Sequence, residues 1–239
     1  VIGAGARFRR TMTRALAIAQ RTGALVTLGV RPTCPETGYG YIRPGAPLRG
    51  AAAGAAWVDA FVEKPPLARA RRLLAAGALW NSGMFVWRVD RILEELQQLL
   101  PEVYEPLARA VHAGGASALA RAYRRLPSVS IDTGVMERAE RVAVVPADFP
   151  WSDVGSWAAV GALWRGGAAD GAAARGRVVA VDSRRCVVDS PERLVALLGV
   201  DDLVVVDSPD AVLVCRVDRA QDVRRVVAEL ERRGLGRYL

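Results

Sequence analysis

Lysine, histidine and cysteine are scarce in this sequence of 239 residues. The 33 basic residues include a single lysine, Lys64, and the only histidine is His112. The three cysteines lie far apart, at positions 34, 186 and 215. This odd, widely spaced set argues against a disulfide framework or a CxxC zinc site and favours a reducing, cytoplasmic location. Any bound metal would have to be a hard cation held by carboxylates.

Long hydrophobic runs are also missing. No stretch of about 18 apolar residues is free of charges, and no charged start followed by an apolar run opens the sequence. We therefore expect no membrane-spanning helix and no signal peptide. The net charge of +8 raises the question of nucleic acid, but the arginines are scattered in pairs and no aromatic residues interleave with them. We expect a solvated arginine surface and no nucleic-acid partner.

Strands alternate with helices over residues 1–164, which predicts an α/β domain with a largely parallel sheet. Apolar spacing predicts helices at 8–19, 67–76, 89–100 and 157–163, and strands at 25–30, 57–64, 79–87 and 142–145. Residues 43–56 are rich in proline, glycine and alanine, and we expect a loop there.

A different composition follows this alternating region. Residues 165–176 consist mostly of glycine and alanine and predict a linker. Residues 177–239 carry short β-branched runs that alternate with Asp-Ser turns, and apolar positions from Val223 to Leu230 predict a closing helix. We expect a small β-rich domain, for which a β-helix is one candidate, although no regular period supports a long solenoid.

Two candidate binding segments lie at strand ends. Gly40, between two tyrosines, would allow a ligand to approach the backbone, although a simple hairpin turn explains the same residues. Glu63 and Lys64 end an apolar strand just before two prolines. The Lys64 ammonium is a compact charge suited to a phosphate, and the alternative is an exposed strand end.

Polar residues in three further segments carry both a ligand-binding and a structural interpretation. Asn81 and Ser82 interrupt an apolar strand, so they could bind sugar hydroxyls or form a β-bulge with local hydrogen bonds. Asp153 lies between two tryptophans and could hold Mg²⁺ together with water and phosphate, or cap the following helix. Asp132 precedes an expected helix start at 136–141 and could equally be a cap.

Read in order, these segments resemble the mannose-1-phosphate guanylyltransferase (GDP-mannose pyrophosphorylase) family. The matching strings are LVTLGVRPTCPETGYGYI (25–42), FVEKPP (61–66), LWNSGMFVWRVDRILEEL (79–96), SIDTGVME (130–137), FPWSDVGSW (149–157) and LLGVDDLVVVDSPDAVLVC (197–215). The resemblance implies an α/β fold: a Rossmann-like, GT-A-like nucleotidyltransferase domain with a mixed sheet over residues 1–164, then the linker and the small β-rich domain over 177–239.

Two features of that family are missing here. Its glycine-rich phosphate loop, GGxGTRLWPLSR, and the segment with its second metal-binding aspartate do not occur in the sequence. We therefore expect an N-terminally truncated chain, incomplete in its nucleotide-binding part, that carries the sugar-phosphate half of the site and is inactive alone. Thr133 and Gly134 also replace the family's usual Tyr-Ala or Tyr-Gly after Asp132.

The resemblance implies a role for each candidate residue. Lys64 would pair with the phosphate of the sugar phosphate, and the backbone near Gly40 would bind mannosyl hydroxyls together with Glu63 and Asn81. Ser82 is expected beside Asn81 in the same substrate-binding set.

The remaining expectations concern the metal, the partners and the location. Asp132 joins the substrate-binding set, and Asp153 would ligate Mg²⁺ as cofactor. The expected partners are GTP and mannose-1-phosphate, with no membrane and with a homodimer left open; the expected location is the cytoplasm. Two alternatives stay open: transfer to another sugar-1-phosphate, such as glucose-1-phosphate with UTP or dTTP, and a non-catalytic regulatory homologue that binds sugar nucleotide.

Overall fold

The structure is a computed structural model that describes residues 1–50, 54–164 and 172–239. Contacts divide the chain into two compact units: Ile2–Trp151, and Ser152–Leu239 together with Val1. The expected domain boundary between residues 164 and 165 stays a prediction. Within the described parts of the chain, no helix combines the length and the apolar character that a membrane span requires.

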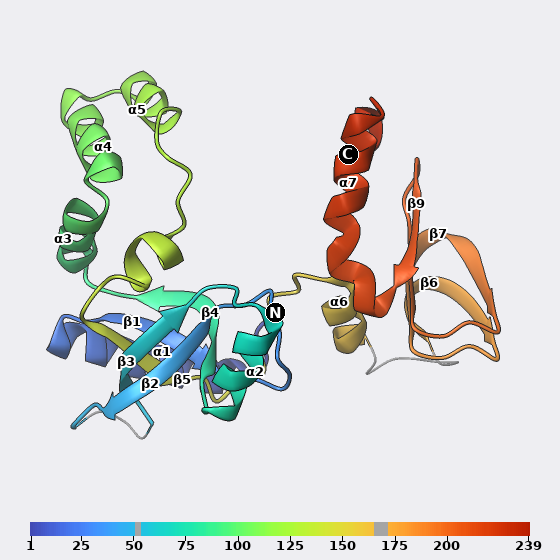
Figure 1. The fold of residues 1–239 in the computed structure, drawn as a ribbon, viewed down its shortest axis with the longest axis horizontal. Helices are drawn as coiled ribbons and strands as arrows, with labels where there is room; N and C mark the ends of the chain where they lie inside the picture. Colours follow the sequence, from blue (N-terminus) through green and yellow to red (C-terminus); the bar gives the residue numbers. More distant parts are fainter. Residues whose placement is uncertain (51–53, 165–171) are drawn as a thin grey trace. The chain divides into compact units, whose positions relative to one another are not determined.

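The first unit alternates helices and strands as the sequence predicts (Figure 1). Its elements are α1 (Gly5–Thr22), β1 (Leu25–Val30), β2 (Tyr41–Pro47), β3 (Ala56–Val62), α2 (Leu67–Ala75), β4 (Leu79–Val86), α3 (Val89–Leu99), α4 (Pro101–Ala113), α5 (Ala116–Tyr123), the π-helical turn η1 (Asp132–Met136) and β5 (Val142–Pro146).

The five strands pair in the order β1-β4-β2-β3-β5 and close into a barrel. Only β1 and β5 pair in parallel among the strands described in this unit, from Leu25 opposite Val142 to Gly29 opposite Pro146. The expectation of a largely parallel sheet was therefore wrong, because β2 and β3 form an antiparallel pair and β4 runs antiparallel to both of its neighbours. The mixed sheet that the family resemblance implies is confirmed.

Alternation along β1 separates two cores. Val26 and Leu28 pack with Ile18 of α1 on one face, and Leu25 packs with Met136 of η1 on the other. Successive strand residues point to opposite faces, so a continuous apolar run suits a strand that is covered on both sides. The turn η1 is thereby anchored in the core beside the strand ends.

Two local expectations in this unit were wrong. Residues 43–47, expected in a loop, belong to β2, which continues past its pairing with β4 and tolerates Pro44 and Pro47 there beside bulges. Asp132 does not cap a helix over residues 136–141; it begins the π-helical turn η1.

The second unit contains α6 (Trp157–Trp164), β6 (Ala172–Val181), β7 (Cys186–Leu198), β8 (Leu203–Asp207), β9 (Val212–Arg216) and α7 (Val223–Arg232), with 3₁₀ turns η3 (Val217–Asp222) and η4 (Gly236–Tyr238). β6, β7 and β8 pair in parallel, and β9 closes the sheet antiparallel to β8. Of the expected linker, residues 165–171 lie outside the described residues. Residues 172–176 form the start of β6, so that part of the expectation was wrong.

A corner between β6 and β7 depends on Gly176. Its φ is +106°, and a Cβ there would lie 1.8 Å from the carbonyl oxygen of Ser190. Beyond this point the register shifts, so that Arg177 pairs with Leu194. Only glycine fits both the backbone conformation and the close approach.

Gly29 gives a test of the barrel packing. A Cβ at this position would lie 2.6 Å from Leu79 Cδ1 and 2.7 Å from Val144 Cγ2. We expect Gly29→Ala to lower the free energy of unfolding by about 1–3 kcal/mol through overpacking, measured by urea denaturation. Gly5→Ala is the matched control, because its nearest contact would be the flexible end of Arg9 at 3.6 Å. Equal stability of the two variants would contradict the packing described here.

Candidate active site at the end of strand β4

The Asn81 side chain of the first unit makes three hydrogen bonds. Its amide group donates from Nδ2 to Asp132 Oδ1 at 2.8 Å, and its Oδ1 accepts from Thr27 Oγ1 at 3.1 Å and from the Gly83 amide at 3.2 Å. Its own backbone amide donates to the Gly40 carbonyl at 2.8 Å. Three of the predicted site residues, Gly40, Asn81 and Asp132, therefore lie together.

Ser82 forms the β-bulge with local hydrogen bonds that was one of its two predicted interpretations. Its Oγ accepts from the amide of Met84 at 3.2 Å, within a segment where the β1–β4 register shifts. Between Asn81 and Phe85, β4 has three residues where β1 has only Leu28, between Gly29 and Thr27. The resulting bulge turns Asn81 toward η1. Sugar binding by Ser82 stays a prediction.

Glu63 and Lys64 form a tight turn after β3. The Glu63 amide donates to Glu137 Oε1 at 2.8 Å. Lys64 adopts a left-handed backbone with φ +43°, which is uncommon for a residue other than glycine. Its Nζ lies 3.7 Å from Glu63 Oε1, and the side chain is 60% exposed, so the ammonium is available to a ligand from solvent.

The Glu63 carboxylate faces Gly40. A Cβ on Gly40 would lie 2.4 Å from Glu63 Oε2, so the glycine makes room for that oxygen. Within the described residues, Oε2 is buried and has no hydrogen-bond partner. Buried polar atoms are normally satisfied, and an unpaired one at a site calls for an explanation such as a bound donor.

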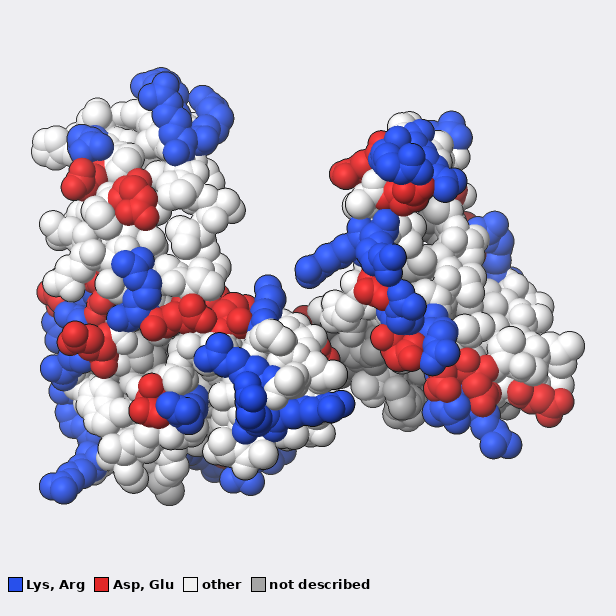
Figure 2. Space-filling view, viewed as in Figure 1, with Lys and Arg blue, Asp and Glu red and all other residues white. Residues whose placement is uncertain are grey.

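Burial raises the pKa of Glu63 above its usual value, and the neighbouring charge of Asp132 adds to the rise. Lys64 acts in the opposite direction, while Glu137 contributes a further increase. Figure 2 shows acidic side chains gathered where the helical arm α3–α5 meets the strands. Lys64 places a positive charge beside Glu63.

An aromatic wall lies near the glycine turn. The Tyr39 ring makes edge-to-face contacts with Trp80 and Trp151, at centroid distances of 5.0 and 5.6 Å. Such contacts hold the rings in fixed positions. The segment from Tyr39 to Gly40 is therefore set between an aromatic cluster and the Glu63 carboxylate.

Asp153 belongs to the second unit, whereas the other predicted site residues belong to the first. Its Oδ1 accepts from the Gly155 amide at 3.0 Å, and Val154 between them has φ +56°. The residue that caps α6 is Ser156, whose Oγ accepts from the Ala159 amide at 3.3 Å. The capping alternative for Asp153 is therefore replaced by a local turn, and Mg²⁺ binding by Asp153 stays a prediction.

A magnesium site at Asp153 would rest on one carboxylate. Across the described residues, no group of three or more histidine, cysteine or acidic side chains could hold a metal ion. A lone carboxylate does not suit an all-protein metal cage, but it fits Mg²⁺, which keeps waters and binds substrate phosphates. Asp153 is thus compatible with that ion.

Two residues of the site were not predicted from the sequence. Thr27 is fully buried in β1, and a hydroxyl inside the apolar run LVTLGV was the available indication. Glu137 lies within the matching string SIDTGVME, but the family resemblance assigns it no role here. In an α-helix, residues five apart differ in direction by about 140°, so the sequence offered no reason to place Glu137 beside Asp132.

Comparison with known proteins identifies the family. The nucleotidyl transferase family model matches residues 1–167, more than half of the chain. The chain belongs to the nucleotidyl transferase family. Residues 176–230 match a second family, described as the MannoseP isomerase/GMP-like beta-helix domain.

The relatives of this nucleotidyl transferase carry related names. The alginate biosynthesis protein AlgA of Pseudomonas aeruginosa is 40% identical over 237 residues, which is 95% of this chain. A mannose-1-phosphate guanylyltransferase of Escherichia coli is 41% identical over 87% of this chain. These alignments cover 48% and 45% of the two relatives, so the chain spans about half of their length.

A solved structure supports the same fold. A protein from Thermus thermophilus, described as a mannose-1-phosphate geranyltransferase, is 42% identical with a TM-score of 0.83. The match covers 97% of this nucleotidyl transferase chain and 67% of that protein. The α/β nucleotidyltransferase fold with a β-rich C-terminal domain is therefore confirmed.

The raised pKa of Glu63 predicts a pH-dependent stability. Because its folded-state pKa exceeds the unfolded value, the stabilising contribution of Glu63 is present at low pH and is lost as the pH rises through the folded pKa. We expect Glu63→Gln to be more stable than the parent at pH 7 and not at pH 4, measured by urea denaturation. Glu140→Gln, at an exposed acid of the same unit, is the control. A stability difference that is the same at both pH values would contradict this assignment.

Proposed function

We propose that this chain supplies the sugar-phosphate side of a mannose-1-phosphate guanylyltransferase, which forms GDP-mannose and pyrophosphate from GTP and mannose-1-phosphate. Relatives that bear this enzyme name are about 40% identical over most of the chain, and the family model is that of a nucleotidyl transferase. We extend their activity to this chain because of its own site residues, above all Glu63 and Lys64.

The observation that carries the proposal is the pairing of an unsatisfied carboxylate oxygen with an exposed ammonium. Glu63 Oε2 is a buried acceptor, and a sugar hydroxyl is a donor of the kind that it needs. Lys64 Nζ lies 3.7 Å from the other carboxylate oxygen. A sugar phosphate offers both a hydroxyl donor and an anion, so it matches this pair better than a neutral sugar or a free phosphate does.

The acid network behind Glu63 would orient the sugar. Asn81 is fixed by Thr27 and Asp132, which leaves its direction no freedom to follow the ligand. Preorganised polar groups of this kind bind without reordering when the ligand arrives. Gly40 allows the ligand to reach both Glu63 and Asn81, since a Cβ there would lie 3.2 Å from Asn81 Cβ.

The proposed reaction is an in-line displacement. A phosphate oxygen of mannose-1-phosphate attacks the α-phosphorus of GTP, the bond from that phosphorus to the β-phosphate oxygen breaks, and pyrophosphate leaves with the electron pair. Such transfers depend on positioning and charge neutralisation rather than on a covalent intermediate. Lys64 would hold the attacking phosphate, and Asp153 would hold Mg²⁺, which neutralises phosphate charge when it is bound.

A charge-removal variant tests the sugar-phosphate assignment. Lys64→Ala should weaken mannose-1-phosphate binding roughly tenfold, the size expected when one charge-assisted hydrogen bond is lost. Isothermal titration calorimetry of the chain measures this directly. In a catalytically active full-length protein, the same change should raise the KM for mannose-1-phosphate far more than the KM for GTP.

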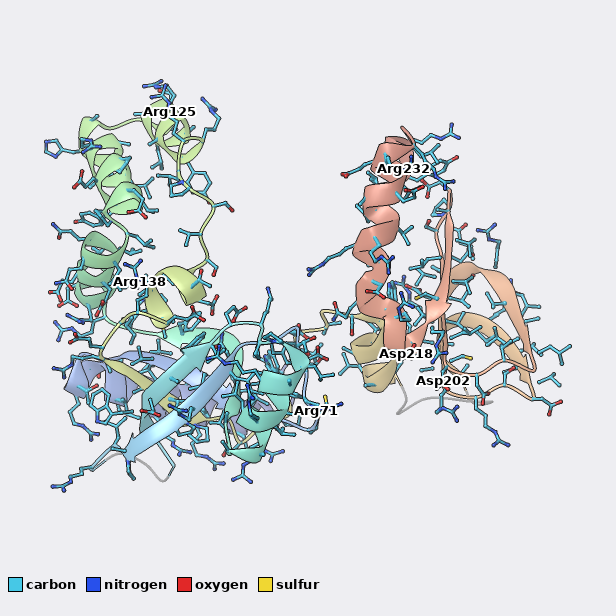
Figure 3. The ribbon with its side chains drawn as sticks, viewed as in Figure 1. Arg71, Arg125, Arg138, Asp202, Asp218 and Arg232 are labelled. Carbon is cyan, nitrogen blue, oxygen red and sulfur yellow. The ribbon has the colours of Figure 1, made fainter. Side chains whose placement is uncertain are left out.

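The matched control is Arg71→Ala, which removes an exposed positive charge from α2, where Arg71 is labelled in Figure 3. Equal losses of affinity in the two variants would show a general charge effect and contradict the role of Lys64. A parallel titration with glucose-1-phosphate decides between the mannose and glucose alternatives. Absence of mannose-1-phosphate binding to the unsubstituted chain would remove the proposal for this chain.

A further inference from the structure

The π-helical turn η1 brings the carboxylates of Asp132 and Glu137 near the same neighbour, Glu63. Its defining bond runs from the Glu137 amide to the Asp132 carbonyl at 2.9 Å, five residues apart. In an α-helix these two side chains would diverge by about 140°. In the wider π turn both carboxylates instead lie near enough to Glu63 for their charges to raise its pKa, and single π turns of this kind are frequent at functional sites.

Each of these two carboxylates accepts a hydrogen bond from a different strand segment. Asp132 Oδ1 accepts from Asn81 Nδ2 at 2.8 Å, at the bulge of β4. Glu137 Oε1 accepts from the backbone amide of Glu63 at 2.8 Å, just past the end of β3. One short turn thus connects the two segments that the proposed function assigns to the sugar phosphate.

The Glu63–Lys64 turn needs such support. Lys64 has φ +43° and directly precedes Pro65, although a residue before proline is restricted to extended conformations. Backbone conformations of this kind persist where the surroundings determine them, and they cluster at ligand sites. The contacts around the turn include the hydrogen bond from the Glu63 amide to the Glu137 carboxylate and the close approach of Glu63 Oε2 to Gly40.

The turn η1 is itself firmly placed. Val135 and Met136 are almost fully buried in the core beside Leu25. Arg138, labelled in Figure 3, donates from Nη1 to the Leu99 carbonyl at 2.8 Å and so ties the end of η1 to α3. The backbone that carries Glu137 is therefore held in place. Glu137 in turn contacts the Glu63–Lys64 turn through the Glu63 amide.

We propose that Glu137 is a positioning residue of the sugar-phosphate site, which fixes the Glu63–Lys64 turn through the Glu63 amide and reaches it because η1 is a π turn. The inference rests on the proposed function for its ligand but not for its geometry. Glu137 touches the turn and acts on the ligand only through Glu63 and Lys64.

Two variants separate the hydrogen bond from the charge. Glu137→Ala removes the acceptor, whereas Glu137→Gln keeps an oxygen acceptor and removes the charge. Glu140→Ala, at an exposed acid three residues along the same segment, is the matched control. Glu137 is exposed, so these changes leave the buried part of η1 intact, and thermal denaturation of each variant verifies this.

Hydrogen exchange of the Glu63 amide, resolved by NMR, is the first measurement, and it needs no ligand. We expect exchange roughly threefold to tenfold faster in Glu137→Ala, the range for loss of one solvent-exposed charge-assisted bond, and within threefold of the parent in Glu137→Gln and Glu140→Ala. Unchanged exchange in Glu137→Ala would overturn the proposal. Equal acceleration in the alanine and glutamine variants would also overturn it, by assigning the effect to the charge.

Mannose-1-phosphate affinity, measured by calorimetry on the same proteins, is the second readout. We expect weaker binding in Glu137→Ala and recovery in Glu137→Gln. If exchange accelerates but the affinity of Glu137→Ala equals that of the parent, the positioning role is overturned. If the unsubstituted chain does not bind mannose-1-phosphate, the proposed function fails, while the exchange measurement still decides whether Glu137 holds the turn.

Discussion

The hydrogen bond from the Asn81 amide group to the Asp132 carboxylate is the interaction on which the site depends, because it joins the β4 bulge to the π turn. It is 2.8 Å long and buried in part, so it holds both side chains in place. Thr27, on the neighbouring strand β1, donates a hydrogen bond to the side-chain oxygen of Asn81. Once Asn81 and Asp132 are fixed, Glu137 lies within reach of the Glu63 amide, and the Glu63–Lys64 turn acquires its position.

This arrangement disfavours the ionised form of Glu63. Its side chain is only 20% exposed and its carboxylate lies among acidic neighbours, so burial and like charge both raise its pKa. A protein selected for stability alone would place a neutral side chain there. Retention of an unsatisfied acid next to a strained lysine is the pattern expected where groups are held ready for a ligand rather than for the fold.

Much of the fold can be predicted from the sequence, and the predictions that were wrong have physical causes. The helix ending at Gly23 and the strand Leu25–Val30 were predictable from apolar spacing and a left-handed C-cap. Strand direction was not, because alternation of helices and strands does not reveal that β4 lies between β1 and β2. The grouping of Gly40, Glu63, Lys64, Asn81 and Asp132 was anticipated through family resemblance. Glu137 was missed because the π turn has no pattern that spacing arguments detect.

The proposed binding site for mannose-1-phosphate lies where the Glu63–Lys64 turn, the β4 bulge and η1 meet. Backbone amide shifts, followed in a two-dimensional NMR titration of the isotopically labelled chain with mannose-1-phosphate, test this placement. We expect saturable shifts centred on the amides of Gly40, Lys64 and Asn81. Saturable shifts confined to residues 172–239, with none at these three amides, would contradict it.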